Sequence, residues 1–111
     1  MKQSITYNVS IWSAEEFFAP LTQEFPTLHD ALTFIENETD KLFVEHGTFI
    51  YFAIKIQNLD SHNHVIFIDD YWRYERDGEI IDNIDLDEDL LQDDKYLYNF
   101  LNGYISALIN C

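Results

Sequence analysis

Alternating apolar and polar residues mark the first structured segment of the chain. The apolar positions, separated by serine, threonine and asparagine, are Ile5, Tyr7, Val9 and Ile11. Side chains two residues apart lie on one side of an extended backbone, so this pattern predicts a half-buried strand. Ser13 and Glu16 then have the spacing of a helix capping box, which predicts a short helix that ends before Pro20.

A period near 3.6 residues replaces the period of two in the next segment. The apolar residues on this helical stripe are Leu28, Ala31, Leu32, Ile35, Leu42 and Phe43. Thr27 is in the position of an N-cap, Asp30 lies in the first turn, and Gly47 follows the last turn as a stop signal. The pattern therefore predicts a helix over residues 27–46.

Two long alternating segments come next, at residues 48–57 and 64–76, and a polar, turn-like stretch joins them. In both segments the apolar residues share one face, which predicts strands that pack against a core on one side. The dipeptide Asp77-Gly78 fits a tight type I′ hairpin turn, so residues 79–83 are expected to form the returning strand.

The last apolar stripe at helical spacing predicts a helix over residues 90–109. Its members are Leu90, Leu97, Leu101, Tyr104, Ile105 and Leu108. Gly103 within it is less favourable than alanine by roughly 1 kcal/mol. The predicted order is β-α-α-β-β-β-α, and hairpin-linked strands flanked by helices indicate one α+β domain over residues 1–111. We expect an antiparallel sheet of about four strands with the helices packed on one face.

The composition is that of a chain that buries a core. It is 47% hydrophobic and 16% aromatic, with three glycines and two prolines. No apolar run approaches the ~20 residues that span a bilayer. The N-terminus lacks the basic-then-apolar order of a signal peptide, so we expect a cytoplasmic protein. The single cysteine, Cys111, cannot form a disulfide within the chain.

Negative charge is the strongest bias in the sequence. There are 21 acidic residues against six lysines and arginines, a formal net charge of −15. Between residues 69 and 94 twelve acids face only Arg73 and Arg76. These acids are Asp69, Asp70, Glu75, Asp77, Glu79, Asp82, Asp85, Asp87, Glu88, Asp89, Asp93 and Asp94. Nucleic acid and anionic lipid would be repelled, so the expected partner is a basic protein.

Motifs for catalysis or cofactor binding are poorly represented. The chain has no G-x-S-x-G, no glycine-rich phosphate loop and no H-E-x-x-H. The alternating acids from Asp85 match the start of an EF-hand loop, but Leu90 and Tyr96 occupy the positions that need glycine and glutamate. His62 and His64 fall short of a zinc site and are expected to face solvent in a turn. We therefore expect a protein that is not an enzyme and needs no metal or other cofactor.

The spacing of the carboxylates indicates how such a protein could bind. Acids two apart on a strand project from one face about 7 Å apart, and acids three or four apart on a helix lie about 6 Å apart. Asp69 shares a predicted strand face with Arg73 and Glu75, and further acids surround the Asp77-Gly78 turn. If these segments adjoin, they form a curved band of charge comparable with the phosphates of duplex DNA.

In size, acidity, aromatic content and the acidic run at 69–94, the chain resembles the loose class of DNA-mimic proteins. This class includes anti-restriction and anti-CRISPR inhibitors from phages. It also includes a small neisserial DNA mimic that binds the histone-like protein HU. Its members share no fold or motif, so the resemblance transfers no functional residue. It implies a non-catalytic protein that occupies the basic surface of a nucleoid protein, nuclease or defence-system protein and inhibits or modulates it. The expected contact residues are the twelve acids named above.

Two alternatives stay open. An immunity protein that neutralises a basic nuclease toxin would use the same acidic surface, with a tighter and more aromatic contact. A generic adaptor would need the charge only for solubility. Aromatic residues between the acids, among them Tyr71, Trp72 and Tyr96, would suit a protein interface if they are exposed.

Overall fold

The computed structural model describes residues 4–13, 19–47, 50–84 and 94–110. In chain order the elements are β1 (Thr6–Ser13), β2 (Leu21–Phe25), α1 (Leu28–His46), β3 (Ile50–Gln57), β4 (His64–Ile68), β5 (Trp72–Arg76), β6 (Glu79–Asn83) and α2 (Asp94–Ile109). All strands join one antiparallel sheet in the order β2-β1-β3-β4-β5-β6. The predicted α+β class and antiparallel sheet are confirmed.

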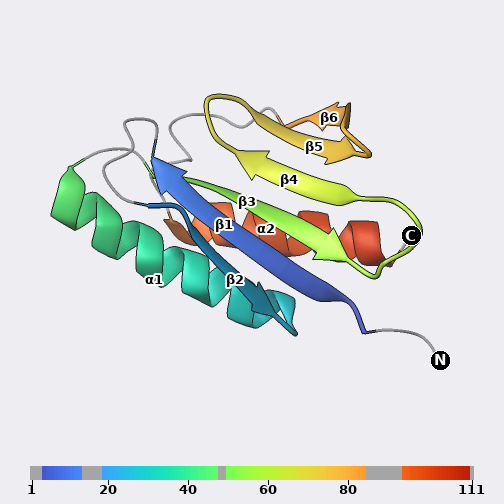
Figure 1. Ribbon diagram of the computed structural model, residues 1–111, viewed down its shortest axis with the longest axis horizontal. Coiled ribbons are helices and arrows are strands. Elements are labelled where there is room, and N and C mark those ends of the chain that lie inside the picture. Colours follow the sequence, from blue (N-terminus) through green and yellow to red (C-terminus); the bar gives the residue numbers. More distant parts are fainter. Residues whose placement is uncertain (1–3, 14–18, 48–49, 85–93, 111) are drawn as a thin grey trace.

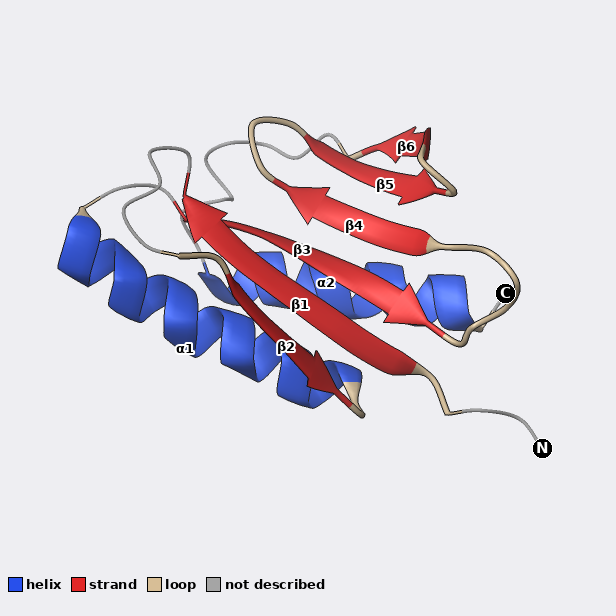
Figure 2. Ribbon diagram, in the orientation of Figure 1, coloured by secondary structure: helices blue, strands red, loops and turns tan. Residues whose placement is uncertain are grey.

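Both helices lie on one side of the sheet, as Figure 1 shows. Helix α1 packs against β1, β2 and β3 and against α2. The same arrangement in Figure 2, coloured by secondary structure, shows that no described element covers the opposite side. We call this opposite side the uncovered sheet face.

The sheet has six strands rather than about four, and β2 is one of the two that the sequence did not predict. Its residues Leu21–Phe25 pair with β1, but as an edge strand it is mostly exposed and carries no alternating apolar signal. Ser13, expected to cap a short helix, is instead the last residue of β1. Residues 14–18, where that helix was expected, lie outside the described residues.

The other added strand arises because the long strand predicted at 64–76 is two strands, β4 and β5. The chain reverses between them, and the backbone N–H of Tyr71 donates to Asp69 Oδ1 at 3.2 Å. Aspartate side chains that bond the backbone two residues on favour such turns. The predicted return at Asp77-Gly78 is confirmed: both residues have positive φ, 53° and 85°, as a type I′ turn requires.

The core lies between the sheet and the helices and follows the predicted alternation. Buried members include Tyr7, Val9, Ile11, Phe52, Ile54, Ile56, Ile66, Ile68, Leu101 and Ile105. Helix α1 begins and ends as expected: Thr27 accepts from the Asp30 amide, and Gly47 adopts φ 66°. Phe43, predicted to lie on the buried stripe, is 56% exposed. The C-terminal end of α1 extends past the strands in Figure 1, so the sheet does not cover it.

Candidate protein interface

Four of the predicted contact residues that the structure describes lie at the two ends of β5. Asp69 and Asp70 lie in the turn that precedes β5, and the chain leaves β6 at the same end, where the Ile84 amide donates to the Trp72 carbonyl at 2.9 Å. Asp77 and Glu79 lie at the other end, around the β5–β6 turn. A five-residue strand spans ~17 Å, so these are two acidic groups with Glu75 between them.

Asp82 is placed apart from these two groups, on the helix side of the sheet. It accepts a hydrogen bond of 2.6 Å from the hydroxyl of Tyr104 in α2. Burial and this carboxylate raise the pKa of Tyr104 well above its usual range. The remaining predicted residues lie outside the described residues, apart from Asp94, whose backbone begins α2. Those outside are Asp85, Asp87, Glu88, Asp89 and Asp93.

Arg73 pairs with two of the predicted carboxylates, Asp69 of the first acidic group and Glu75 between the groups. Its guanidinium donates to Glu75 on the same face of β5, as predicted, and at 2.8 Å to Asp69, which lies in the preceding turn and not on the strand as predicted. The same group lies 4.2 Å from the ring centroid of Phe67 and 4.3 Å from that of Tyr71. The arginine side chain is only 12% exposed, so this cluster is ordered before any partner binds.

At the second acidic group Asp77 ties the β5–β6 turn to the loop between β3 and β4. Its carboxylate accepts from the Asn63 amide at 2.8 Å and lies 2.7 Å from His62 Nδ1. The backbone hydrogen bond, followed by the histidine, lowers the pKa of Asp77 below its usual range. Asp77 therefore stays ionised at neutral pH, but part of its hydrogen-bonding capacity is already used.

His64 is buried, 4% exposed, and not solvent-facing as the sequence indicated. It is the first residue of β4, and its side chain lies on the core side of the sheet. Nε2 lies 2.8 Å from Asp60 and Nδ1 lies 2.6 Å from the Tyr74 hydroxyl. Because a carboxylate only accepts, Nε2–H donates to Asp60. The described residues contain no group of three or more potential metal ligands.

The uncovered sheet face carries aromatic residues that the sequence reasoning did not select. Trp12 and Tyr51 are cross-strand partners with ring centroids 6.3 Å apart. The Tyr51 hydroxyl donates to Asp70 at 2.7 Å, and this bond to a carboxylate raises the pKa of Tyr51. Tyr71, which was a candidate, is 54% exposed. The sequence did contain a sign of this cluster. At the positions of β1 and β3 that face away from the core, where small polar residues are usual, it has Trp12 and Tyr51.

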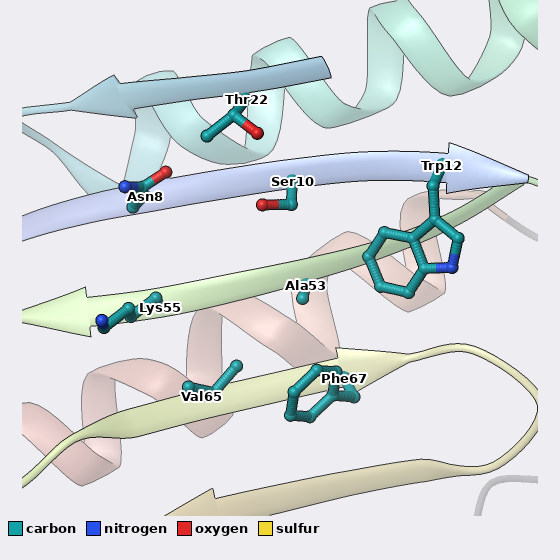
Figure 3. Close-up of a pocket in the computed structure, with 8 residues that line it drawn as sticks. All are labelled: Asn8, Ser10, Trp12, Thr22, Ala53, Lys55, Val65 and Phe67. Carbon is teal, nitrogen blue, oxygen red and sulfur yellow. The ribbon is translucent and has the colours of Figure 1, made fainter. Parts of the chain in front are cut away.

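A shallow hollow of about 260 Å³ lies in the middle of this face (Figure 3). Ser10 and Ala53, opposite each other on β1 and β3, are small and leave the space open. Trp12 borders one end and Lys55 the other, while Phe67 lies along the side. The remaining lining residues are Asn8, Thr22 and Val65.

Comparison with known proteins identifies no relative. No protein family, no curated protein and no solved structure matches the chain. Neither described helix is long and apolar enough to cross a membrane.

Proposed function

We propose that this chain is a non-catalytic acidic protein that occupies the basic nucleic-acid-binding surface of a DNA-binding protein and thereby inhibits or modulates it. One observation carries the proposal: among the described carboxylates, only Asp69 and Glu75 pair with an arginine or lysine. Most carboxylates of the described residues therefore have no lysine or arginine partner there, and the chain as a whole has a net charge of −15. Its field extends into solvent and attracts a cationic protein.

The amount of charge on residues 69–94 supports the comparison with DNA. Twelve carboxylates against two arginines leave ten negative charges there. Duplex DNA carries one charge per about 1.7 Å of axis, so ten net charges equal those on about 17 Å of duplex. The part of this segment before Asp85 has six acids and two arginines, a net of four negative charges. The acids from Asp85 onwards are needed for the match.

The decisive variant therefore neutralises the acids immediately after β6. It combines Asp85→Asn, Asp87→Asn, Glu88→Gln and Asp89→Asn. Partner capture from a bacterial lysate should fall strongly, while folding stays intact or improves because self-repulsion decreases. The wild-type chain should retain a DNA-binding protein that free duplex DNA displaces and that rising salt releases.

A matched control removes the same number of charges from helix α1. It combines Glu36→Gln, Glu38→Gln, Asp40→Asn and Glu45→Gln. If residues 85–89 contact the partner, this control should keep most of the capture. Equal loss in both variants would mean that only net charge matters, and a captured partner that DNA does not displace would contradict the DNA-mimic proposal.

An immunity protein against a basic nuclease toxin is the second candidate, favoured by the aromatic cluster on the uncovered sheet face. Trp12, Tyr51 and Tyr71 are residue types enriched in tight protein interfaces. Such a complex should persist at high salt, where a contact made by charge alone weakens. Recovery of one nuclease whose activity the chain blocks at high salt would favour this candidate over the mimic.

A further inference from the structure

The uncovered sheet face already binds one guanidinium group, that of Arg73. Its Cζ atom lies 4.2 Å and 4.3 Å from the ring centroids of Phe67 and Tyr71, and the group donates to Asp69 and Glu75. A planar, weakly hydrated guanidinium favours this combination of aromatic face and carboxylate. The chemistry of this face therefore suits arginine.

The same components, aromatic rings and a carboxylate, recur at the Trp12 end of the hollow. The rings of Trp12 and Tyr51 lie against each other, and Tyr51 donates its hydroxyl to Asp70. Asp70 forms no ion pair with any residue that the structure describes. A carboxylate has about four acceptor positions, so one bond from a hydroxyl leaves room for a guanidinium. The hollow over Ala53 opens next to Trp12, as Figure 3 shows.

We propose that this hollow binds an arginine side chain of the cationic partner. The aliphatic stem lies over Ala53 and Ser10, and the guanidinium stacks on the indole of Trp12 on the side of Asp70. The volume of about 260 Å³ is below the ~300–1,000 Å³ of small-molecule pockets, which matches one side chain. The inference rests on the proposed function in one respect, that the partner is a cationic protein.

Lys55 determines at which end of the hollow a guanidinium can bind. It lies at the end opposite Trp12 and forms no ion pair with any described residue. Its cross-strand partner Asn8 is four residues from Trp12 along β1, a separation of ~13 Å. At 0.15 M salt the Debye length is about 8 Å, so Lys55 repels a cation placed beside it but little affects one at Trp12. The guanidinium is therefore expected at the Trp12 end.

The test uses four capped pentapeptides that differ only at the central position. Two lysines flank each side, and the centre is arginine, lysine, citrulline or leucine. Binding is followed by NMR at the Trp12 indole N–H and the Ala53 amide. The arginine peptide should bind about 2- to 5-fold more tightly than the lysine peptide, the range of an exposed cation–π contact. Equal binding of these two peptides, or tightest binding of the leucine peptide, would overturn the proposal.

Two variants locate the effect. Ala53→Leu fills the hollow and Asp70→Asn removes the carboxylate charge, and each should abolish the preference for arginine over lysine. Glu79→Gln is the matched control for charge, because it removes one carboxylate at the other end of β5, and it should leave the preference unchanged. If Ala53→Leu fails to fold, Asp70→Asn alone decides. An arginine preference that survives Asp70→Asn places the site elsewhere and refutes the assignment.

Failure of this inference is distinguishable from failure of the proposed function. The peptide experiment reads selectivity at Trp12, whereas the proposed function is read from partner capture, its displacement by DNA and its loss on neutralising residues 85–89. Capture that is sensitive to DNA together with peptides that bind equally would remove the arginine site alone. Arginine selectivity with a captured partner indifferent to DNA would leave the site and remove the mimic.

Discussion

Replacement of Arg73 by methionine tests how much the Arg73 guanidinium and its contacts stabilise the domain. The change leaves Asp69 and Glu75, which are 20% and 18% exposed, without their counter-ion. Exposed ion pairs contribute about 0–1 kcal/mol, whereas breaking a buried one costs about 3–5 kcal/mol. These partly buried pairs fall between, at about 2 kcal/mol, and the lost contacts with Phe67 and Tyr71 add about 1 kcal/mol. We expect the free energy of unfolding to fall by about 3 kcal/mol.

Urea denaturation followed by circular dichroism measures this loss. With a slope of about 2 kcal/mol per molar urea, the midpoint should fall by about 1.5 M. Arg73→Lys should lose roughly half as much, because lysine keeps the charge without the planar, stacked donors. Adding Asp69→Asn and Glu75→Gln to Arg73→Met should recover most of the loss. A loss below about 1 kcal/mol in the single variant, or no recovery in the triple variant, would refute the reasoning.

Two further predictions concern the core and the hairpin end. Ile54→Ala, at a fully buried position of β3, should lower the free energy of unfolding measured with urea by about 2–5 kcal/mol. Val65→Ala on the uncovered sheet face should lower it by about 1 kcal/mol or less. Equal losses would contradict a core on only one side of the sheet. Asp60 and Asp77 have pKa values lowered in the folded state, so their contribution is present above the ordinary carboxyl pKa near 4 and is lost as pH falls through the lowered values. The double variant Asp60→Asn/Asp77→Asn should therefore show a smaller drop in urea midpoint between pH 6 and pH 2 than the wild type. The control Glu79→Gln, whose side chain makes none of the histidine or backbone contacts of Asp60 and Asp77, should show the wild-type drop. Identical drops in the wild type and both variants would contradict this prediction.

The unpaired carboxylates and the aromatic residues around Trp12 have different expected roles in the binding of a partner. Uncompensated carboxylates attract a cationic partner from a distance and affect mainly the rate of association. In the proposed complex the aromatic residues around Trp12 are expected to make short contacts, which would affect mainly the rate of dissociation. The salt dependence of the two rates separates these contributions.

Most individual elements could be predicted because their signals are local. The alternation in β1 and β3, the caps of α1 at Thr27 and Gly47, and the turn at Asp77-Gly78 each depend on residues within a few positions. The α+β class follows from their order. Strand β2 was missed because an exposed edge strand needs no apolar face, and its pairing with β1 is what makes it a strand.

The sequence by itself determined the charge, the helix α1 and the face that Arg73 and Glu75 share, since spacing along one strand decides which side chains are neighbours. Only the tertiary structure decided which distant groups meet. Sheet register brings Trp12 to Tyr51, and loop packing brings His62 to Asp77. Those contacts depend on strand order and on turns between strands, and no periodicity within a single segment encodes either.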